Sequence, residues 1–267
     1  MNLINRNISL AIEAAIKAGI TILDVYSTAE FKIETKSDNS PLTLADQRAH
    51  EVIMELLKQT GLPVLSEEGR SIPYEMRSHW KQFWLVDPLD GTKEFIKRNG
   101  EFTVNIAFIE NKLPTVGVIY VPVTDTLYVG EVGNGAVIMH KAAKQLTDSG
   151  FDTCKTENLP NKKHYTYGIV ASRSHLNEET TTFINDTKSK HPDVRIISKG
   201  SSLKICMVAE GEADIYPRFG LTSEWDVAAG HAIALASGAT VTIANTNEPL
   251  TYNKENILNP WFIVKRN

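Results

Sequence analysis

The N-terminal part of the chain places apolar residues at helical spacing. The positions of this stripe are Ile4, Ile8, Ile12, Ile16, Ile20 and Leu23. Such a stripe predicts one face of a long amphipathic helix. A polar stretch follows, and after Pro41 a second helical pattern covers about residues 45–58. Gly61 and Pro63 end that pattern, and Val64-Leu65 is then typical of a short strand.

The middle of the chain changes to the period of two that strands show. The compact apolar run Phe83–Val86 predicts a buried strand that stops at Asp87-Pro88. From Thr103 onward, apolar residues alternate with polar or small neighbours over residues 103–108, 116–120 and 126–139. An Asn134-Gly135 pair marks a hairpin turn within the last run. This part of the chain is therefore expected to form an antiparallel meander.

Beyond residue 163, short strand patterns alternate with helical ones. Strands are expected at residues 165–171, 194–197, 213–216, 240–243 and 261–264, with helices near residues 176–184, 202–209 and 226–237. Alternation of this kind predicts a layered α/β unit. The polar, lysine-rich stretch Lys141–Lys163 is the best candidate for a boundary between two lobes.

Composition narrows the class of protein. The 267 residues include 28 Lys and Arg against 32 Asp and Glu, a formal charge of −4, so a general affinity for nucleic-acid polymers is not expected. Hydrophobic residues make up 42%, which is typical of a globular protein. Two cysteines cannot form a disulfide framework, and no stretch reads as a signal peptide or membrane span. We therefore expect a cytoplasmic protein; its oligomeric state stays open.

The hexapeptide from Asp87 to Thr92 carries the candidate chemistry. Because Pro88 ends the strand ladder, Asp87 and Asp90 are expected to turn to the same side of a tight bend. The carbonyl of Leu89 between them can serve as a neutral ligand. Gly91 tolerates unusual backbone angles and allows close approach, and Thr92 can cap a short helix over residues 93–97 whose amides bind an anion.

Other acids strengthen this interpretation. Taken alone, an Asp/Gly/Thr turn is more often an ordinary acidic turn. However, Glu67-Glu68 also follows a strand, while Asp46 and Asp226 stand at helix starts. Each helix-start acid is individually explained by the helix dipole. Together, acids at strand ends and helix starts predict a site for a hard divalent cation such as Mg²⁺.

The ordered set of motifs resembles the magnesium-dependent, lithium-sensitive phosphatase superfamily of inositol monophosphatases. The matching elements, in chain order, are Asp46, Glu67-Glu68, the hexapeptide at 87–92 and Trp225-Asp226-Val227-Ala228-Ala229. Their flanks are most similar to the CysQ-type 3'(2'),5'-bisphosphate nucleotidases. The flanking stretches are residues 36–43, 90–95, 200–204 and 216–220.

This resemblance implies both a fold and an activity. The expected fold is an α/β, layered α-β-α-β-α sandwich in two lobes. The α+β lobe of residues 1–145 would carry most metal ligands, and the α/β lobe of residues 146–267 would supply Asp226 and substrate contacts. The implied reaction releases the 3'-phosphate of adenosine 3',5'-bisphosphate, a by-product of sulfate activation, to leave AMP.

The resemblance also implies a role for each residue. One Mg²⁺ would be held by Glu67, Asp87 and the Leu89 carbonyl, and a second by Asp87, Asp90 and Asp226, with a weaker third near Glu67. Because no nucleophilic side chain is evident, water would attack phosphorus, oriented and deprotonated by Thr92 together with Asp46.

The substrate is expected to contact the metal-site residues and the turn beside them. These contacts are Glu67, Leu89, Asp90, Gly91, Thr92 and Asp226. The amides of Gly91 and Thr92 would hold the phosphate. Lys204 and Arg218 are candidates for the 5'-phosphate or the base edge, and equally for surface charges. Glu68 is expected to act indirectly, behind the ligands.

Several alternatives stay open on the sequence alone. The enzyme could act on inositol monophosphate or fructose bisphosphate, although Lys93-Glu94 and Tyr216-Pro217-Arg218 argue against both. A non-catalytic nucleotide or metal sensor is disfavoured by the complete set of acids. A structural partner at a membrane surface is disfavoured by the acidic charge, although weak association with the inner face of a membrane stays open. The choice between 3'- and 2'-phosphate and cleavage of the activated sulfate donor are not decided, and lithium inhibition is implied by the family only.

Overall fold

In the computed structural model, the described residues are 6–27, 33–35, 41–149, 154–171, 177–191 and 193–266. The predicted apolar position Ile4 and most of the nucleotidase-like stretch at 36–43 lie outside this set. So does a part of the lysine-rich stretch, residues 150–153. Of the helices in the described ranges, none has both the length and the apolar character of a membrane span.

A seven-stranded sheet forms the first half of the molecule. Its order is β3 (Val64–Ser66), β4 (Gln82–Asp90), β5 (Thr103–Glu110), β6 (Leu113–Val121), β7 (Thr126–Glu131), β8 (Gly135–His140) and β9 (Glu157–Asn158). From β4 to β9 neighbouring strands are antiparallel, and only the edge pair β3–β4 runs parallel. The predicted meander is confirmed.

A mixed five-stranded sheet forms the second half. Its order is β11 (Val194–Ser198), β10 (Tyr167–Ala171), β12 (Ile215–Arg218), β14 (Phe262–Arg266) and β13 (Ala239–Ile243). The first three strands are parallel, and β14 runs antiparallel to both of its neighbours. Alternating strands and helices in this part of the chain confirm the predicted α/β arrangement.

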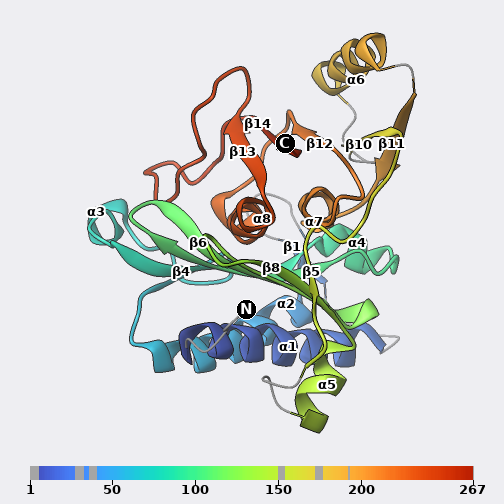
Figure 1. The fold of residues 1–267 in the computed structure, drawn as a ribbon. Coiled ribbons are helices and arrows are strands. Elements are labelled where there is room, and N and C mark those ends of the chain that lie inside the picture. The colour runs from blue at the N-terminus through green and yellow to red at the C-terminus, as the bar shows by residue number, and fades with distance from the viewer. Residues whose placement is uncertain are drawn as a thin grey trace.

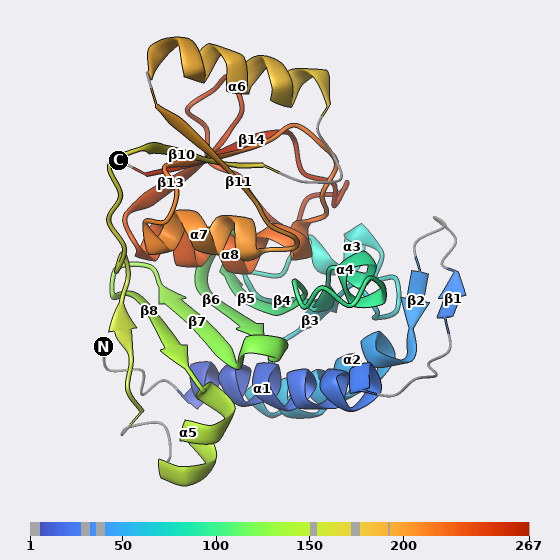
Figure 2. The same cartoon turned by 90° about the vertical axis from the view of Figure 1, so that its right-hand side faces the viewer.

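Helices separate and cover the two sheets, which gives the expected α-β-α-β-α layers (Figures 1 and 2). The outer layer against the first sheet is α1 (Arg6–Ser27) with α2 (Leu44–Leu57). The middle layer is α7 (Leu203–Glu210) with α8 (Glu224–Ala236), and α6 (Glu178–Lys190) covers the second sheet. The remaining elements are β1 (Ile33–Thr35), β2 (Pro41–Thr43), α3 (Tyr74–Arg77), α4 (Thr92–Ile96), α5 (Ala142–Ser149) and two short 3₁₀ turns at Lys58–Thr60 and Pro122–Thr124.

The predicted stripe of α1 is correct only in part. Ile8, Ile12 and Ile16 are buried, but Ile20 is 46% exposed and Ile22 lies in the core instead. The reason is geometric, because a strict spacing of four residues advances 400° along a helix of about 100° per residue. The stripe therefore drifts by about 40° at each step, and by Ile20 it has turned away from the sheet.

The lysine-rich stretch contains elements that its composition concealed. Helix α5 occupies Ala142–Ser149, and β9 pairs with β8 through Val137 and Ile138. The first sheet thus continues to Asn158, past the expected boundary at residues 145 and 146. That boundary itself stays a prediction.

Helix α8 lies against the first sheet at two glycines. A Cβ built on Gly117 of β6 would collide with the carbonyl oxygen of Ala229, and one on Gly130 of β7 would lie 2.6 Å from the Cα of Ile233. The backbone of the helix therefore touches the backbone of the sheet, which only residues without a side chain allow. Since α8 also begins at Glu224, beside Asp226, this contact fixes the position of a candidate ligand.

We expect Gly117→Ala to destabilise the fold by about 1–3 kcal/mol, the usual cost of an added methyl group in a filled core. Urea unfolding monitored by circular dichroism would measure the change. Gly220→Ala is the matched control, because its Cβ would meet no atom closer than 3.6 Å. Equal midpoints for the two variants would show that α8 is free to shift away from the sheet.

Candidate active site

Two strand ends bring the first acids together. Strands β3 and β4 are parallel, with Ser66 opposite Val86, so their carboxyl ends lie at the same edge. Glu67 follows β3, and its amide donates to the carbonyl of Val86 at 3.1 Å. Asp87 is the next residue on β4. The pairing of these two strands therefore places Glu67 beside Asp87.

A β-bulge then aligns Asp87 with Asp90. The expectation that the strand stops at Asp87-Pro88 is wrong, because β4 continues to Asp90 with a shift in register. Asp87 pairs with Asn105 and Asp90 with Thr103, so two residues of β4 face one of β5. Thr103 and Asn105 share one face of β5 and are joined by a 2.9 Å hydrogen bond. Directly opposite residues share a face as well, which puts both aspartates on the same side.

The bulge also fixes the Asp87 carboxylate and accommodates the proline. The amide of Leu89 donates to Asp87 Oδ1 at 3.1 Å. Pro88, which has no amide hydrogen, lies within the bulge, where a ladder bond is already missing. The Leu89 side chain is buried in the core of the first sheet. Its carbonyl remains a candidate ligand.

Asp226 arrives from the other half of the chain in a capping box. Ser223 is the N-cap of α8 and Asp226 is the third residue of the helix. Asp226 Oδ2 accepts a hydrogen bond of 2.9 Å from the amide of Ser223, while the Ser223 side chain accepts one from the helix. This motif satisfies amides that a helix start leaves unpaired. It also holds Asp226 in one orientation.

Glu67, Asp87 and Asp226 form a cluster that suits a metal ion. One carboxylate oxygen from each lies within 4.8 Å of the others. Burial is the main cause that raises the pKa of Asp87 well above its usual value. The negative charges of Glu67, Asp90, Asp226 and Asp46, in decreasing order, raise it further. This many carboxylates in one buried place repel one another, and a hard divalent cation is the usual compensation. The donor set therefore fits Mg²⁺.

Burial also affects Asp226, and Asp46 adds a further acid to this centre. Burial and the nearby charges of Asp90 and Glu67 raise the pKa of Asp226 to about 8. Asp46 is buried in the first turn of α2, and its charge is among those that raise the pKa of Asp87. The structure thus brings together acids from four separate elements.

Asp90 stands beside this cluster and is held by hydrogen bonds. Its Oδ2 accepts bonds from Ser201 Oγ at 2.7 Å, from the amide and hydroxyl of Ser202 at 2.7 and 2.8 Å, and from Asn105 Nδ2 at 3.3 Å. None of these partners was predicted from the sequence to have a role in the site. Asn105 could have been recognised from the sequence, because it is a polar residue between Val104 and Ile106 in an otherwise apolar strand.

Gly91 has the unusual backbone conformation predicted for it, whereas Thr92 is not the helix cap that was predicted. Gly91 has a φ of 96°, the left-handed conformation that favours glycine, and a Cβ there would lie 3.3 Å from the Cβ of Ser201. Thr92 does not cap the short helix, because it is the first residue of α4 and Gly91 is the N-cap. The helix begins earlier than expected, with a bond from the amide of Phe95 to the carbonyl of Gly91 at 2.9 Å.

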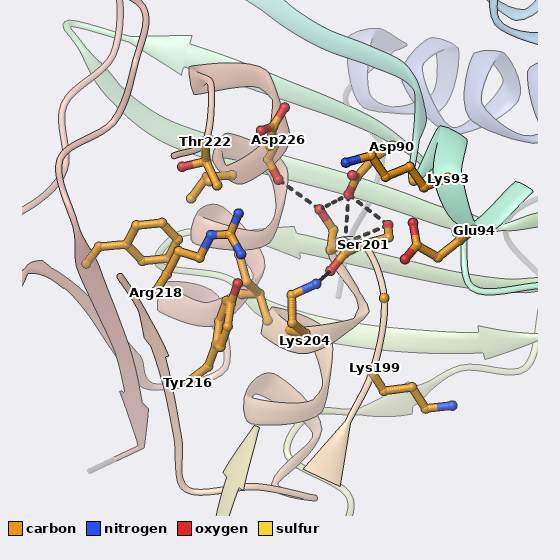
Figure 3. A pocket seen from close by; sticks show the side chains of 16 residues that line it. Asp90, Lys93, Glu94, Lys199, Ser201, Lys204, Tyr216, Arg218, Thr222 and Asp226 are labelled. Atoms are coloured by element: carbon orange, nitrogen blue, oxygen red, sulfur yellow. Dashed lines mark hydrogen bonds between the residues drawn. The ribbon is translucent and has the colours of Figure 1, made fainter. Parts of the chain in front are cut away.

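A pocket of about 160 Å³ opens beside the acids (Figure 3). Its lining residues come from both halves of the chain: Asp90, Gly91, Lys93, Glu94, Lys199, Gly200, Ser201, Ser202, Lys204, Ile205, Tyr216, Arg218, Thr222, Asp226, Val227 and Phe262. Arg218 and Lys204 line the side opposite Glu94 (Figure 3). Lys93 lies on the same side as Glu94, and Asp226 lies near Arg218, so carboxylates and cations both surround the pocket (Figure 3).

The two cations are not surface charges. Lys204 is buried, its Nζ donates to the Ser201 carbonyl at 2.6 Å, and burial lowers its pKa to about 8. Arg218 Nη2 donates to the Leu221 carbonyl at 2.8 Å. Its Nε is buried and meets no hydrogen-bond acceptor among the described residues. A buried donor of this kind is available to an anion in the pocket.

Comparison with known proteins agrees with this geometry. The model of the inositol monophosphatase family matches residues 5–261. The chain belongs to the inositol monophosphatase family. It is 45% identical to the 3'(2'),5'-bisphosphate nucleotidase CysQ of Shigella flexneri over 94% of this chain and 96% of that protein. Identity to CysQ of Escherichia coli strain K12 is 44%, with the same coverage.

Solved structures show the same relationship. The crystal structure of CysQ from Bacteroides thetaiotaomicron, a bacterial member of the family, superposes with a TM-score of 0.86 at 52% identity, covering 96% of each chain. An inositol monophosphatase from Anabaena superposes with a TM-score of 0.66 at 23% identity, covering 96% of this chain and 88% of the other. The second likeness shows the shared fold alone.

The acidic cluster predicts how pH and Mg²⁺ act on stability. The pKa of Asp226 in the folded chain, about 8, lies above its ordinary value of 3.8, so between these values the folded state binds more protons than the unfolded state. The free energy of unfolding of the metal-free protein should therefore fall as pH rises from 4 to 8. Mg²⁺ at about 100 times its Kd should restore about 2.7 kcal/mol at pH 8.

Thermal unfolding at several pH values, with and without Mg²⁺, would measure both effects. Asp87→Asn removes one of the repelling charges while keeping the acceptor for Leu89. This variant should be more stable than the parent without metal at pH 8 and should gain little from Mg²⁺. A parent protein that is stabilised by Mg²⁺ at pH 5 but not at pH 8 would contradict the expectation.

Proposed function

We propose that this protein is a Mg²⁺-dependent phosphatase that removes the 3'-phosphate of adenosine 3',5'-bisphosphate, leaving AMP and inorganic phosphate. The observation that carries the proposal is a pocket that adjoins a cluster of possible metal ligands and is also lined by the buried Lys204 and by Arg218. The named activity of relatives that are 45% identical along nearly the whole chain supports the choice of substrate. We expect the substrate to be a free cytoplasmic nucleotide.

The metal ligands follow from the placement of the acids. We assign Glu67, Asp87 and the Leu89 carbonyl to one Mg²⁺, and Asp87, Asp90 and Asp226 to a second, with a third near Glu67. When bound, such ions neutralise the charge of the phosphoryl group and acidify water. The support is chemical, since hard carboxylate and carbonyl oxygens are the donors that Mg²⁺ prefers.

Water is the nucleophile in this proposal. The hydroxyls of Ser201 and Ser202 both donate to Asp90, which this proposal uses as a metal ligand rather than as a base. We assign the orientation of the attacking water to Thr92 Oγ and the acceptance of its proton to the pair of Thr92 and Asp46. Asp46 is buried and its charge reaches Asp87, so a carboxylate that can accept a proton is present at this centre.

Lys204 and Arg218 would bind the phosphate that is not cleaved. A nucleoside bisphosphate carries a second anion at a fixed distance from the reacting phosphate, and Lys204 and Arg218 supply donors for it. Gly91 and Thr92 stay as proposed contacts of the reacting phosphate. An inositol monophosphate has no second anion, so it would leave the buried Arg218 Nε without an acceptor, which disfavours it as a substrate.

The direct test is phosphate release in Mg²⁺ from adenosine 3',5'-bisphosphate and from inositol 1-phosphate, measured side by side. We expect a preference for the nucleotide of at least about tenfold in kcat/KM, because one well-placed charged hydrogen bond contributes about 1.5–3 kcal/mol. Asp90→Asn is the negative control and should release no phosphate while remaining folded. A preference for inositol 1-phosphate would overturn the substrate assignment, and full turnover by Asp90→Asn would overturn the metal assignment.

Lys204 gives a prediction about pH. Since its pKa in the folded protein is about 8, below the ordinary 10.5, the side chain loses its charge as pH rises through 8. The kcat/KM for the bisphosphate reports the free enzyme and should fall above that pH. Lys204→Arg keeps the charge and should move this decline to higher pH, whereas Lys204→Met should lower kcat/KM about tenfold or more and remove the decline. An identical profile in all three proteins would exclude Lys204 from substrate binding.

A further inference from the structure

A buried polar network runs from the middle of β5 to Asp90. The side chains of Thr103 and Asn105 are almost completely buried, at 0% and 1% exposure. Thr103 Oγ donates to Asn105 Oδ1 at 2.9 Å, which fixes the orientation of the amide. Asn105 Nδ2 then points at two acceptors, Ser202 Oγ at 2.9 Å and Asp90 Oδ2 at 3.3 Å. Such a network is costly to bury unless every member is satisfied.

Ser202 joins this network to the other half of the chain. Its side chain is 3% exposed, and its Oγ lies 2.8 Å from both Asp90 Oδ2 and the carbonyl oxygen of Asp226. Its amide also donates to Asp90 Oδ2, at 2.7 Å. A hydroxyl has a single hydrogen to share between two acceptors. Ser202 therefore links a carboxylate on β4 to the first turn of α8, which carries another acid.

The bonds to Asp90 converge on one oxygen. Donors from Ser201, Ser202 and Asn105 all end on Oδ2, as the dashed lines around Asp90 show in part (Figure 3). With Oδ2 surrounded by donors, the carboxylate has one orientation and presents Oδ1 for other interactions.

We propose that Asn105 and Ser202 are positioning residues that hold the Asp90 carboxylate in one orientation beside Asp226, so that the two can bind one divalent cation. This inference rests on the metal site of the proposed function and adds two residues to it, neither of which touches the ion. Loss of either donor leaves Asp90 free to turn away from the charges around it. The affinity for metal then falls although all ligands are still present.

The test is a titration of the protein with Mg²⁺ alone, by calorimetry and without substrate. Ser202→Ala and Asn105→Ala should each weaken binding about 10–100-fold, the usual effect of losing a partner that orients a ligand. Ser202→Thr keeps the hydroxyl and should restore most of the affinity. Because both residues act on the same oxygen, the double variant should lose less than the sum of the two single losses in binding free energy.

Tyr128→Phe is the matched control. It removes another buried hydroxyl from the first sheet, one that donates to Glu210 Oε1 at 2.5 Å, away from the acidic centre. This variant should lose stability in urea but bind Mg²⁺ as the parent does. A purely structural role for Ser202 would instead make Ser202→Ala resemble Tyr128→Phe, less stable with unchanged Mg²⁺ affinity, and would overturn the proposal.

Metal binding in this test does not depend on the substrate. If phosphate release shows a different substrate but Ser202→Ala still weakens Mg²⁺ binding, the positioning role stands and only the substrate assignment fails. If Asn105→Ala does not fold, Ser202→Ala decides alone, because it removes one hydroxyl and leaves the amide bond to Asp90 in place. A parent protein with no measurable Mg²⁺ binding would overturn both the metal site and this inference.

Discussion

Repulsion among buried carboxylates is the constraint on which the rest of this structure depends. Carboxylates held this close without compensation turn apart or take up protons, so each must be fixed by backbone geometry that the fold supplies for other reasons. The parallel pair β3–β4 places Glu67 beside Asp87, the bulge turns Asp90 to the same side, and the capping box holds Asp226. Each device satisfies local hydrogen bonds as well, which is why the acids remain ordered while the site as a whole favours a cation.

Helix α8 is the element through which stability and chemistry are coupled. It lies between the two sheets and touches the first one at glycines of β6 and β7, so its position has little freedom. Its first turn carries Asp226 and accepts a hydrogen bond from Ser202. A change in packing at the far end of the helix would therefore shift the position of Asp226, because closely packed interiors transmit small displacements.

Local patterns predicted the elements well, and tertiary contacts explain where they failed. The meander, the α/β part and the grouping of acids followed from periodicity and from carboxylates at strand ends. The bulge did not, because Pro88 was taken as the end of a ladder, whereas pairing with Thr103 and Asn105 continues past it. Helix α5 was hidden by the lysine-rich composition around it. Ser202 and Asn105 come from distant segments, and only the folded chain shows that both meet Asp90.

Asp90 connects the proposed metal site electrostatically with Lys204. Burial lowers the pKa of Lys204, and the negative charge of Asp90 opposes that effect. A divalent cation on Asp90 would neutralise this negative charge. The pKa of Lys204 would then be lower until an anion binds beside it. A phosphate beside Lys204 would supply that negative charge and raise the pKa of Lys204 again, so that the amine binds a proton from solvent. The proposed metal and the second phosphate would therefore be linked by electrostatics within this pocket of about 160 Å³, which favours a substrate that carries two anions.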